Sequence, residues 1–148
     1  MRRILSFTLF LAILGLSASA QSIVGSWEYT DGSESFSLTF NSDGSCIETD
    51  ATVEDFGQAT YPVVCIANCS YKLDGKIVTI TINSATLQVA SMSEADKKRY
   101  KNEIDELREE MIGDIQGLSM KYEIKKVTDN KLVLYNLDNN IKQELTRI

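Results

Sequence analysis

Three cysteines are the most reactive side chains in this sequence. Cys65 and Cys69 stand four residues apart and could close a tight loop, while Cys46 could reach either of them from a neighbouring strand. In an oxidising compartment an odd number of thiols leaves one unpaired, either free or bridged to another molecule. The spacing leaves the pairing open, so Cys46, Cys65 and Cys69 are all disulfide candidates.

Acid–base and metal chemistry is limited by the lack of histidine in the 148 residues. Without imidazole there is no Ser–His or Cys–His pair, and no side chain titrates near neutrality unless a carboxylate is strongly shifted. Three cysteines alone make a poor tetrahedral zinc site. Carboxylates such as Glu48, Asp50 and Glu123 remain, but nothing in their spacing marks a catalytic pair. The sequence therefore predicts a protein that is not an enzyme, with no cofactor and no metal site.

The first twenty residues have the pattern of a secretory signal peptide. Arg2 and Arg3 precede an apolar run over residues 4–16, and the small residues at 18–20 suit cleavage before Gln21. The run is shorter than the ~20 residues that a spanning helix needs, and no cysteine at the cleavage point could carry a lipid. We expect a signal peptide at 1–20 and one domain at 21–148, exported to the periplasm or secreted, not lipid-anchored and without a membrane span.

The expected mature domain is acidic. Two of the 15 Lys and Arg residues lie in residues 1–20, so 13 basic residues face 21 acidic ones, a net charge of −8. A surface of this sign repels the phosphate backbone, and no basic stripe interrupts it. The charge therefore argues against nucleic-acid binding.

Most of the domain consists of short alternating segments separated by turn residues, a pattern typical of half-buried strands. Phe36, Leu38 and Phe40, for example, alternate with polar residues. Pro62 favours an edge or a bulge, because proline cannot donate to a ladder. Seven or eight strands in sequence order predict an all-β, up-and-down antiparallel β-barrel of about eight strands, which hides its edges by closing. The segments cover residues 23–30, 34–41, 45–53, 60–66 with 70–73, 76–83, 120–127, 131–137 and 141–147.

One helical segment, at about 93–117, interrupts these strands. Ser93 is the expected N-cap and Gly117 the expected end. The stripe of this helix could pack on the outside of the sheet, lie over one barrel mouth as a lid or plug, or meet a partner or membrane surface. The mixed charge of the polar face argues against a membrane surface. The apolar stripe is Tyr100, Ile104, Leu107, Met111 and Ile115.

The start of the first strand, Gly25-Ser26-Trp27, resembles the Gly-x-Trp signature of lipocalins and their relatives. Further similarity to small exported bacterial lipocalin-like proteins lies at residues 40–44, 71–75 and 122–134, so the resemblance covers nearly all of 22–148. It implies a calycin-type β-barrel in which Gly25, Trp27 and Arg147 form a structural signature. Trp27 would pack at the closed end, and Arg147 on the last strand would cover its indole in a cation–π contact.

Two functions fit a barrel of this size, whose interior holds either one small ligand or the side chains that fill it. The first is a carrier of a small hydrophobic ligand, which the resemblance also implies. The second is a filled barrel that acts as a protein-interaction or inhibitor scaffold without small-molecule cargo, using acidic loops at 48–55 and 138–140. The inward candidates for ligand contact are Trp27, Tyr29, Phe36, Leu38, Phe40, Tyr71, Tyr122 and Leu134.

Overall fold

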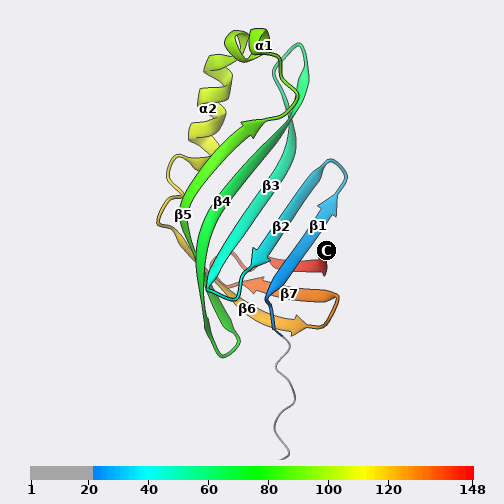
Figure 1. Cartoon of the computed structure of the whole chain (residues 1–148), viewed down its shortest axis with the longest axis vertical. Helices are drawn as coiled ribbons and strands as arrows, with labels where there is room; N and C mark the ends of the chain where they lie inside the picture. The colour runs from blue at the N-terminus through cyan, green and yellow to red at the C-terminus, as the bar shows by residue number, and fades with distance from the viewer. Residues whose placement is uncertain (1–21) are drawn as a thin grey trace, which may run out of the picture.

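The computed structural model describes residues 22–148, and the expected signal peptide lies outside the described residues. Eight antiparallel strands close a barrel in the order β1 to β8 (Figure 1). The expected up-and-down barrel with an inserted helical segment is confirmed. The strands are β1 (Gly25–Asp31), β2 (Glu34–Phe40), β3 (Ser45–Asp55), β4 (Thr60–Asp74), β5 (Ile77–Val89), β6 (Ser119–Val127), β7 (Lys131–Asn136) and β8 (Lys142–Arg147).

The alternation of side chains along each strand separates the lumen from the surface. Directly opposed residues of a ladder share a face, and the register opposes Trp27 to Leu38 and Leu38 to Glu48. Because Trp27 and Leu38 are buried, this face is the inner one. The core of the barrel consists of Ile23, Trp27, Leu38, Phe40, Cys46, Ala67, Cys69, Val78, Ile80, Ile82, Tyr122, Leu132, Leu134 and Leu145.

Strand β4 differs from the expected strand in two ways. It runs without a break through the segment between residues 66 and 70, where a bulge between Asn68 and Cys69 preserves the pairing with β5. The expected edge or bulge at Pro62 is wrong, because β4 lies between β3 and β5 and the bulge is elsewhere. Pro62 is tolerated because it sits where β5 ends: pairing with β5 begins at Val63, and the Pro62 carbonyl accepts the Ala90 N–H at 2.8 Å.

The inserted segment forms two short helices, α1 (Glu94–Arg99) and α2 (Lys101–Ile112), in place of the single helix expected over 93–117. Ser93 is the N-cap, as expected, and its hydroxyl accepts the Asp96 N–H at 3.1 Å. The helical hydrogen bonds stop well before Gly117 because that residue bonds to the sheet, its N–H donating to the Ile82 carbonyl at 2.7 Å. No helix within residues 22–148 is long and apolar enough to cross a membrane.

The helices lie beside the part of β3, β4 and β5 that extends beyond the other strands (Figure 1). Val89 is opposed to Val63, and Val63 shares a face of β4 with Cys65 and Ala67, which face the lumen. The helices therefore cover the inner face of this extension, above the barrel mouth, and not the outer face. Their contacts form a second apolar cluster of Met92, Tyr100, Ile104, Phe56, Tyr61 and Val89.

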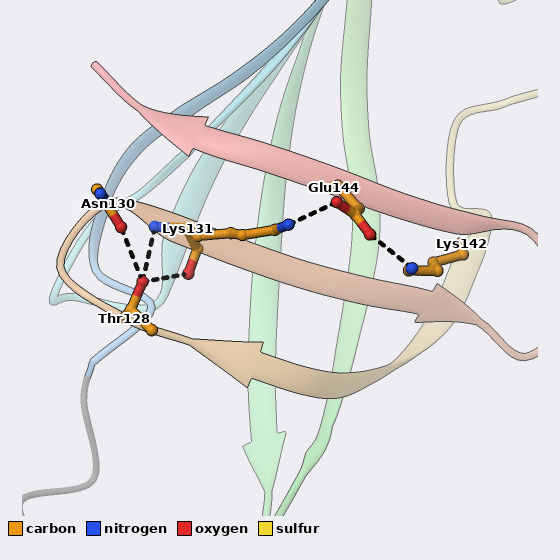
Figure 2. Close-up of polar contacts among 5 residues, drawn as sticks. All are labelled: Thr128, Asn130, Lys131, Lys142 and Glu144. Carbon is orange, nitrogen blue, oxygen red and sulfur yellow. Dashed lines mark hydrogen bonds and ion pairs between the residues drawn. The ribbon is translucent and has the colours of Figure 1, made fainter.

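Polar side chains on the outer face fix the last hairpins of the barrel. Figure 2 shows Glu144 between two lysines, with its oxygens 2.6 Å from Lys131 Nζ and 2.5 Å from Lys142 Nζ. These ion pairs lower the pKa of Glu144 to about 2. In the β6–β7 turn the Thr128 hydroxyl accepts the Lys131 N–H at 3.0 Å and donates to Asn130 Oδ1 at 3.1 Å. These side chains lie on the outer face of the barrel and do not line the lumen.

Candidate functional site

One end of the barrel is sealed by Trp27. The indole is fully buried, and its Nε1 donates to the Ile23 carbonyl at 2.7 Å. The Arg147 guanidinium lies over the ring, with Cζ 4.1 Å from the ring centroid. Arg147 also donates to two backbone carbonyls, from Nη1 to Val24 at 3.2 Å and from Nε to Asp129 at 2.6 Å. The cation–π contact and these two hydrogen bonds fix the guanidinium over the indole at this end of the barrel.

Gly25 has a structural role in this seal. Its φ is +133°, and a Cβ placed on it would lie 2.1 Å from Arg147 Nη1. We expect Gly25→Ala to lower the free energy of unfolding by about 1–3 kcal/mol, since it adds backbone strain and displaces the guanidinium from the indole. Urea unfolding measures this change.

The control is Gly32→Ala in the β1–β2 turn, where φ is also positive (+61°) but nothing lies within 4 Å of the added Cβ. We expect a smaller loss there, on the order of 1 kcal/mol, from backbone strain alone. Equal losses at the two glycines would show that the contact with Arg147 adds nothing to stability.

The half of the lumen next to this seal is packed with side chains. Phe40 and Tyr71 meet edge to face at 5.0 Å between ring centroids, and the Tyr71 hydroxyl donates to the Asn41 carbonyl at 2.7 Å. Seven of the eight residues expected to contact a ligand pack in or against this core: Trp27, Phe36, Leu38, Phe40, Tyr71, Tyr122 and Leu134. These large side chains occupy much of the lower lumen.

Two hollows mark the open end. Strands β1 and β8 pair only through Trp27–Arg147 and Glu28–Thr146, so they separate beyond that point. The side hollow, about 490 Å³, lies in this separation and is lined by Tyr29, Phe36, Ile141, Gln143 and Leu145, together with the outward-facing Lys142 and Glu144. The mouth hollow, about 210 Å³, lies under the end of α2 and is lined by Glu48, Asp50, Cys65, Ala67, Ile82, Met111, Ile115, Leu118 and Met120.

The two hollows are neighbours. Phe36 lines the side hollow, and its cross-strand partner Asp50 lines the mouth hollow. Tyr29 and Phe36 are therefore the two expected ligand contacts that border open space. Tyr29 is 48% exposed and Phe36 is half-buried. The upper lumen is the one inner surface where expected contact residues and open volume coincide.

The mouth hollow contains a carboxylate in an unusual electrostatic setting. Burial, with a smaller effect from the nearby Asp50 charge, raises the pKa of Glu48 to about 7. Oxygen Oε2 of Glu48 is buried and has no hydrogen-bond partner, and the same is true of Gln143 Oε1 on β8. Buried polar atoms are almost always hydrogen-bonded in native proteins, so these two acceptors need an explanation.

The carboxylates considered from the sequence do not form one group. Glu48 and Asp50 share the inner face of β3, whereas Glu123 is on the outside of β6 and pairs with Lys125 at 2.6 Å. Within residues 22–148 no three Cys, Asp or Glu side chains gather closely enough to hold a metal ion. Gln143 was not among the residues predicted from the sequence, although the alternation of β8 places it on the same face as Leu145 and Arg147.

The cysteines lie on two strands. Cys46 of β3 is directly opposed to Cys69 of β4. All three cysteines are buried, and none of them forms a disulfide. Contact with Cys69 and burial raise the pKa of the Cys46 thiol. A tight loop between Cys65 and Cys69, one of the pairings that the spacing left open, is not formed, because both lie in β4, where four residues span about 13 Å. A disulfide needs Cα atoms within about 4.4–6.8 Å, which directly opposed strand residues meet.

Refolding in a glutathione redox buffer is therefore expected to join Cys46 to Cys69 and to leave Cys65 free. Peptide mapping without reduction measures the linkage, and one free thiol per chain is expected by mass after alkylation. Cys65→Ser is the matched control and should leave the bridge unchanged. A Cys65–Cys69 peptide would contradict the strand register.

Comparisons with known proteins assign no family to this chain. Neither a protein-family model nor a curated protein matches the chain. A solved structure of an uncharacterized protein from Bacteroides eggerthii is similar, with a TM-score of 0.45 and 16% sequence identity, over 86% of this chain and 100% of the other. This chain is an eight-stranded antiparallel β-barrel with a structural neighbour of uncharacterised function.

Proposed function

We propose that this chain is an exported lipocalin-like binding protein that takes up a small molecule with an apolar body at the open end of its barrel. The observation that carries the proposal is the mouth hollow, an inner cavity of about 210 Å³ that lies beneath the helical insertion. Small-molecule sites are concave and mostly apolar, with a few polar groups that orient the ligand. Met111, Ile115 and Met120 give this hollow such a lining around Glu48.

The insertion supports this proposal because it ends at the hollow. Met111 belongs to the last turn of α2, and Ile115 follows it before the chain returns to the sheet. The apolar stripe of the insertion thus covers the mouth in the manner of a lid. An inserted segment that packed only on the outer sheet face would make no such contacts.

The second candidate is a protein-interaction scaffold without cargo. It is favoured by the large side chains that pack together in the lower lumen. The two functions differ in what the upper lumen contains: a carrier retains a small molecule there, and a scaffold does not.

Native mass spectrometry of the full chain, expressed with export to a bacterial periplasm, separates these functions. We expect a mature mass that begins at Gln21 and an adduct on the order of a few hundred daltons or less that is lost on denaturation. A clean apo mass that persists after incubation with apolar small molecules would contradict the carrier function.

Matched variants locate the adduct. Ala67 is buried and lines the mouth hollow, so Ala67→Leu should fill the cavity and abolish the adduct. Ala51 lies on the opposite face of the neighbouring strand β3, so Ala51→Leu adds the same volume outside the lumen and should retain it. Loss or retention in both variants would place the adduct elsewhere.

A further inference from the structure

We propose that the polar end of the ligand is a protonated amine, an organic ammonium group whose counter-ion is the Glu48 carboxylate and whose further acceptor is Gln143 Oε1. This inference rests on the proposed function, since it specifies the chemistry of a molecule bound at the open end. It follows from the two unpartnered acceptors, from the charges around them and from the shape of the cavity.

The position of Glu48 directs its carboxylate into the lumen. Glu48 is opposed to Leu38 on one side and to Ala67 on the other, and both of these residues are buried inner-face side chains. Its Oε2 is buried without a hydrogen-bond partner. Burial of an unpaired carboxylate is costly, whereas a carboxylate that meets a cation and accepts hydrogen bonds is stabilised. The Glu48 carboxylate would therefore be stabilised by a positively charged hydrogen-bond donor in the lumen.

No ion pair within residues 22–148 supplies that donor. The six ion pairs formed within residues 22–148 include neither Glu48 nor its neighbour Asp50. Asp50 is partly desolvated, and its pKa is raised by burial and by the charge of Glu34. Two acidic residues, Glu48 and Asp50, thus line the mouth hollow, and a carboxylate or phosphate ligand would be repelled there.

Gln143 is the second inner-face residue with a buried acceptor that needs a hydrogen-bond donor. It is opposed to Leu134 of the core, so its side chain also faces the lumen, from β8. Its orphaned atom is the amide oxygen, which accepts and does not donate. Both unsatisfied atoms are acceptors, and an ammonium group has up to three N–H donors while an alcohol has one and a carboxylate has none.

The apolar residues that line the mouth hollow determine which ligand body fits it. Met111, Ile115 and Met120 surround Glu48 in a hollow of about 210 Å³, which suits a short alkyl body. Methionine side chains adapt their shape, so they can close around a chain without a fixed outline. The matching ligand class is a small alkylammonium compound.

Binding of three probes of equal length tests the class: hexylamine, 1-hexanol and hexanoate, measured by titration calorimetry at mildly alkaline pH, where the amine is still protonated and Glu48 is ionised. We expect hexylammonium to bind at least about tenfold more tightly than 1-hexanol, and hexanoate to bind most weakly. The isosteric variant Glu48→Gln should remove the tenfold advantage of the amine and leave 1-hexanol binding unchanged.

Two further variants complete the design. Glu28→Gln makes the same change at an exposed position of β1 and should keep the advantage of the amine. Gln143→Met keeps the length of the side chain without the amide oxygen and should weaken amine binding by about three- to tenfold. Circular dichroism shows whether each variant retains the barrel.

Equal or tighter binding of 1-hexanol or hexanoate, or an amine advantage that survives Glu48→Gln, would overturn the ammonium inference while leaving a small-molecule carrier intact. Failure of all three probes would overturn it as well. The carrier function itself would fall only if the native mass were also clean, so the two failures are distinguishable.

Discussion

Trp27→Ala is expected to lower the free energy of unfolding by about 3–5 kcal/mol, the usual cost of truncating a buried aromatic side chain. Trp27 is fully buried, packs within the largest apolar cluster and donates to Ile23. Its loss leaves a cavity and also removes the ring on which Arg147 rests. Because domains of this size are stable by only about 5–15 kcal/mol, the variant should unfold at a much lower urea concentration than the wild type.

Two variants separate the parts of this effect. Trp27→Phe keeps an aromatic ring beneath Arg147 but loses the Nε1 donor, and we expect a smaller loss of about 1–3 kcal/mol from the unpaired Ile23 carbonyl and the reduced volume. Tyr29→Ala, two residues along on the same face but 48% exposed, should cost less than about 1 kcal/mol. If Trp27→Ala were as mild as Tyr29→Ala, the seal would not be a determinant of stability.

The architecture could be predicted from sequence because each strand has its own signal. The alternation of Phe36, Leu38 and Phe40 with polar residues, and turns such as that at Gly44, are local patterns that specify antiparallel neighbours. Arg147 and Trp27 are far apart along the chain, and only closure of the barrel brings them together. Their contact could be anticipated because the resemblance to lipocalins implies it.

The helical insertion and β4 show where local patterns fail. The helix was expected to continue to Gly117, but Gly117 and Leu118 hydrogen-bond to Ile82 of β5. Tertiary contacts therefore override helical periodicity at that end. Similarly, the low strand propensity of proline does not indicate where the neighbouring strand β5 ends. Proline is acceptable in the interior strand β4 because β5 ends beside Pro62.

The candidate site depends on non-local geometry to an even greater extent. Glu48 and Asp50 could be selected as carboxylates, but the burial of Glu48 depends on the register of β3 with β2 and β4. Gln143 could not be identified as a site residue from the sequence. It borders a hollow only because β8 separates from β1 after two residue pairs. Which half of the lumen is filled depends on side chains from all eight strands, and no single segment encodes it.

Glu48→Gln is expected to change the pH dependence of stability more than any other single carboxylate substitution on the inner face. The pKa of Glu48 rises from 4.5 in the unfolded chain to about 7 in the folded protein, chiefly through burial. Below pH 4.5 the group is protonated in both states and its contribution to stability is fully present. As the pH rises toward 7 the unfolded state loses its proton first, so the wild type loses stability, on the order of 3 kcal/mol in total.

The measurement is the difference in the free energy of unfolding between Glu48→Gln and wild type, from urea titrations at several pH values. This difference should be constant in acid, rise in favour of the variant between pH 4.5 and about 7, and then level off. Taking the difference removes groups such as Glu144, whose pKa is lowered to about 2 and which act in the opposite sense. Among the groups that face Glu48, the pKa values of Cys46, Cys65 and Tyr122 are raised, so these acids stay protonated in this range. Contact with Cys46 lowers the pKa of the Cys69 thiol, and burial raises the pKa of Asp50.

The control substitution Glu28→Gln, on the exposed face of β1, should shift stability by less than about 0.5 kcal/mol at every pH. A flat difference curve for Glu48→Gln would mean that water already solvates the Glu48 carboxylate, and the electrostatic reason for an ammonium ligand would disappear. A rising curve would mean that the empty barrel is less stable with Glu48 ionised than with a neutral side chain there. A cationic ligand that binds the ionised form would then restore that stability, because a ligand that binds only the folded state stabilises it.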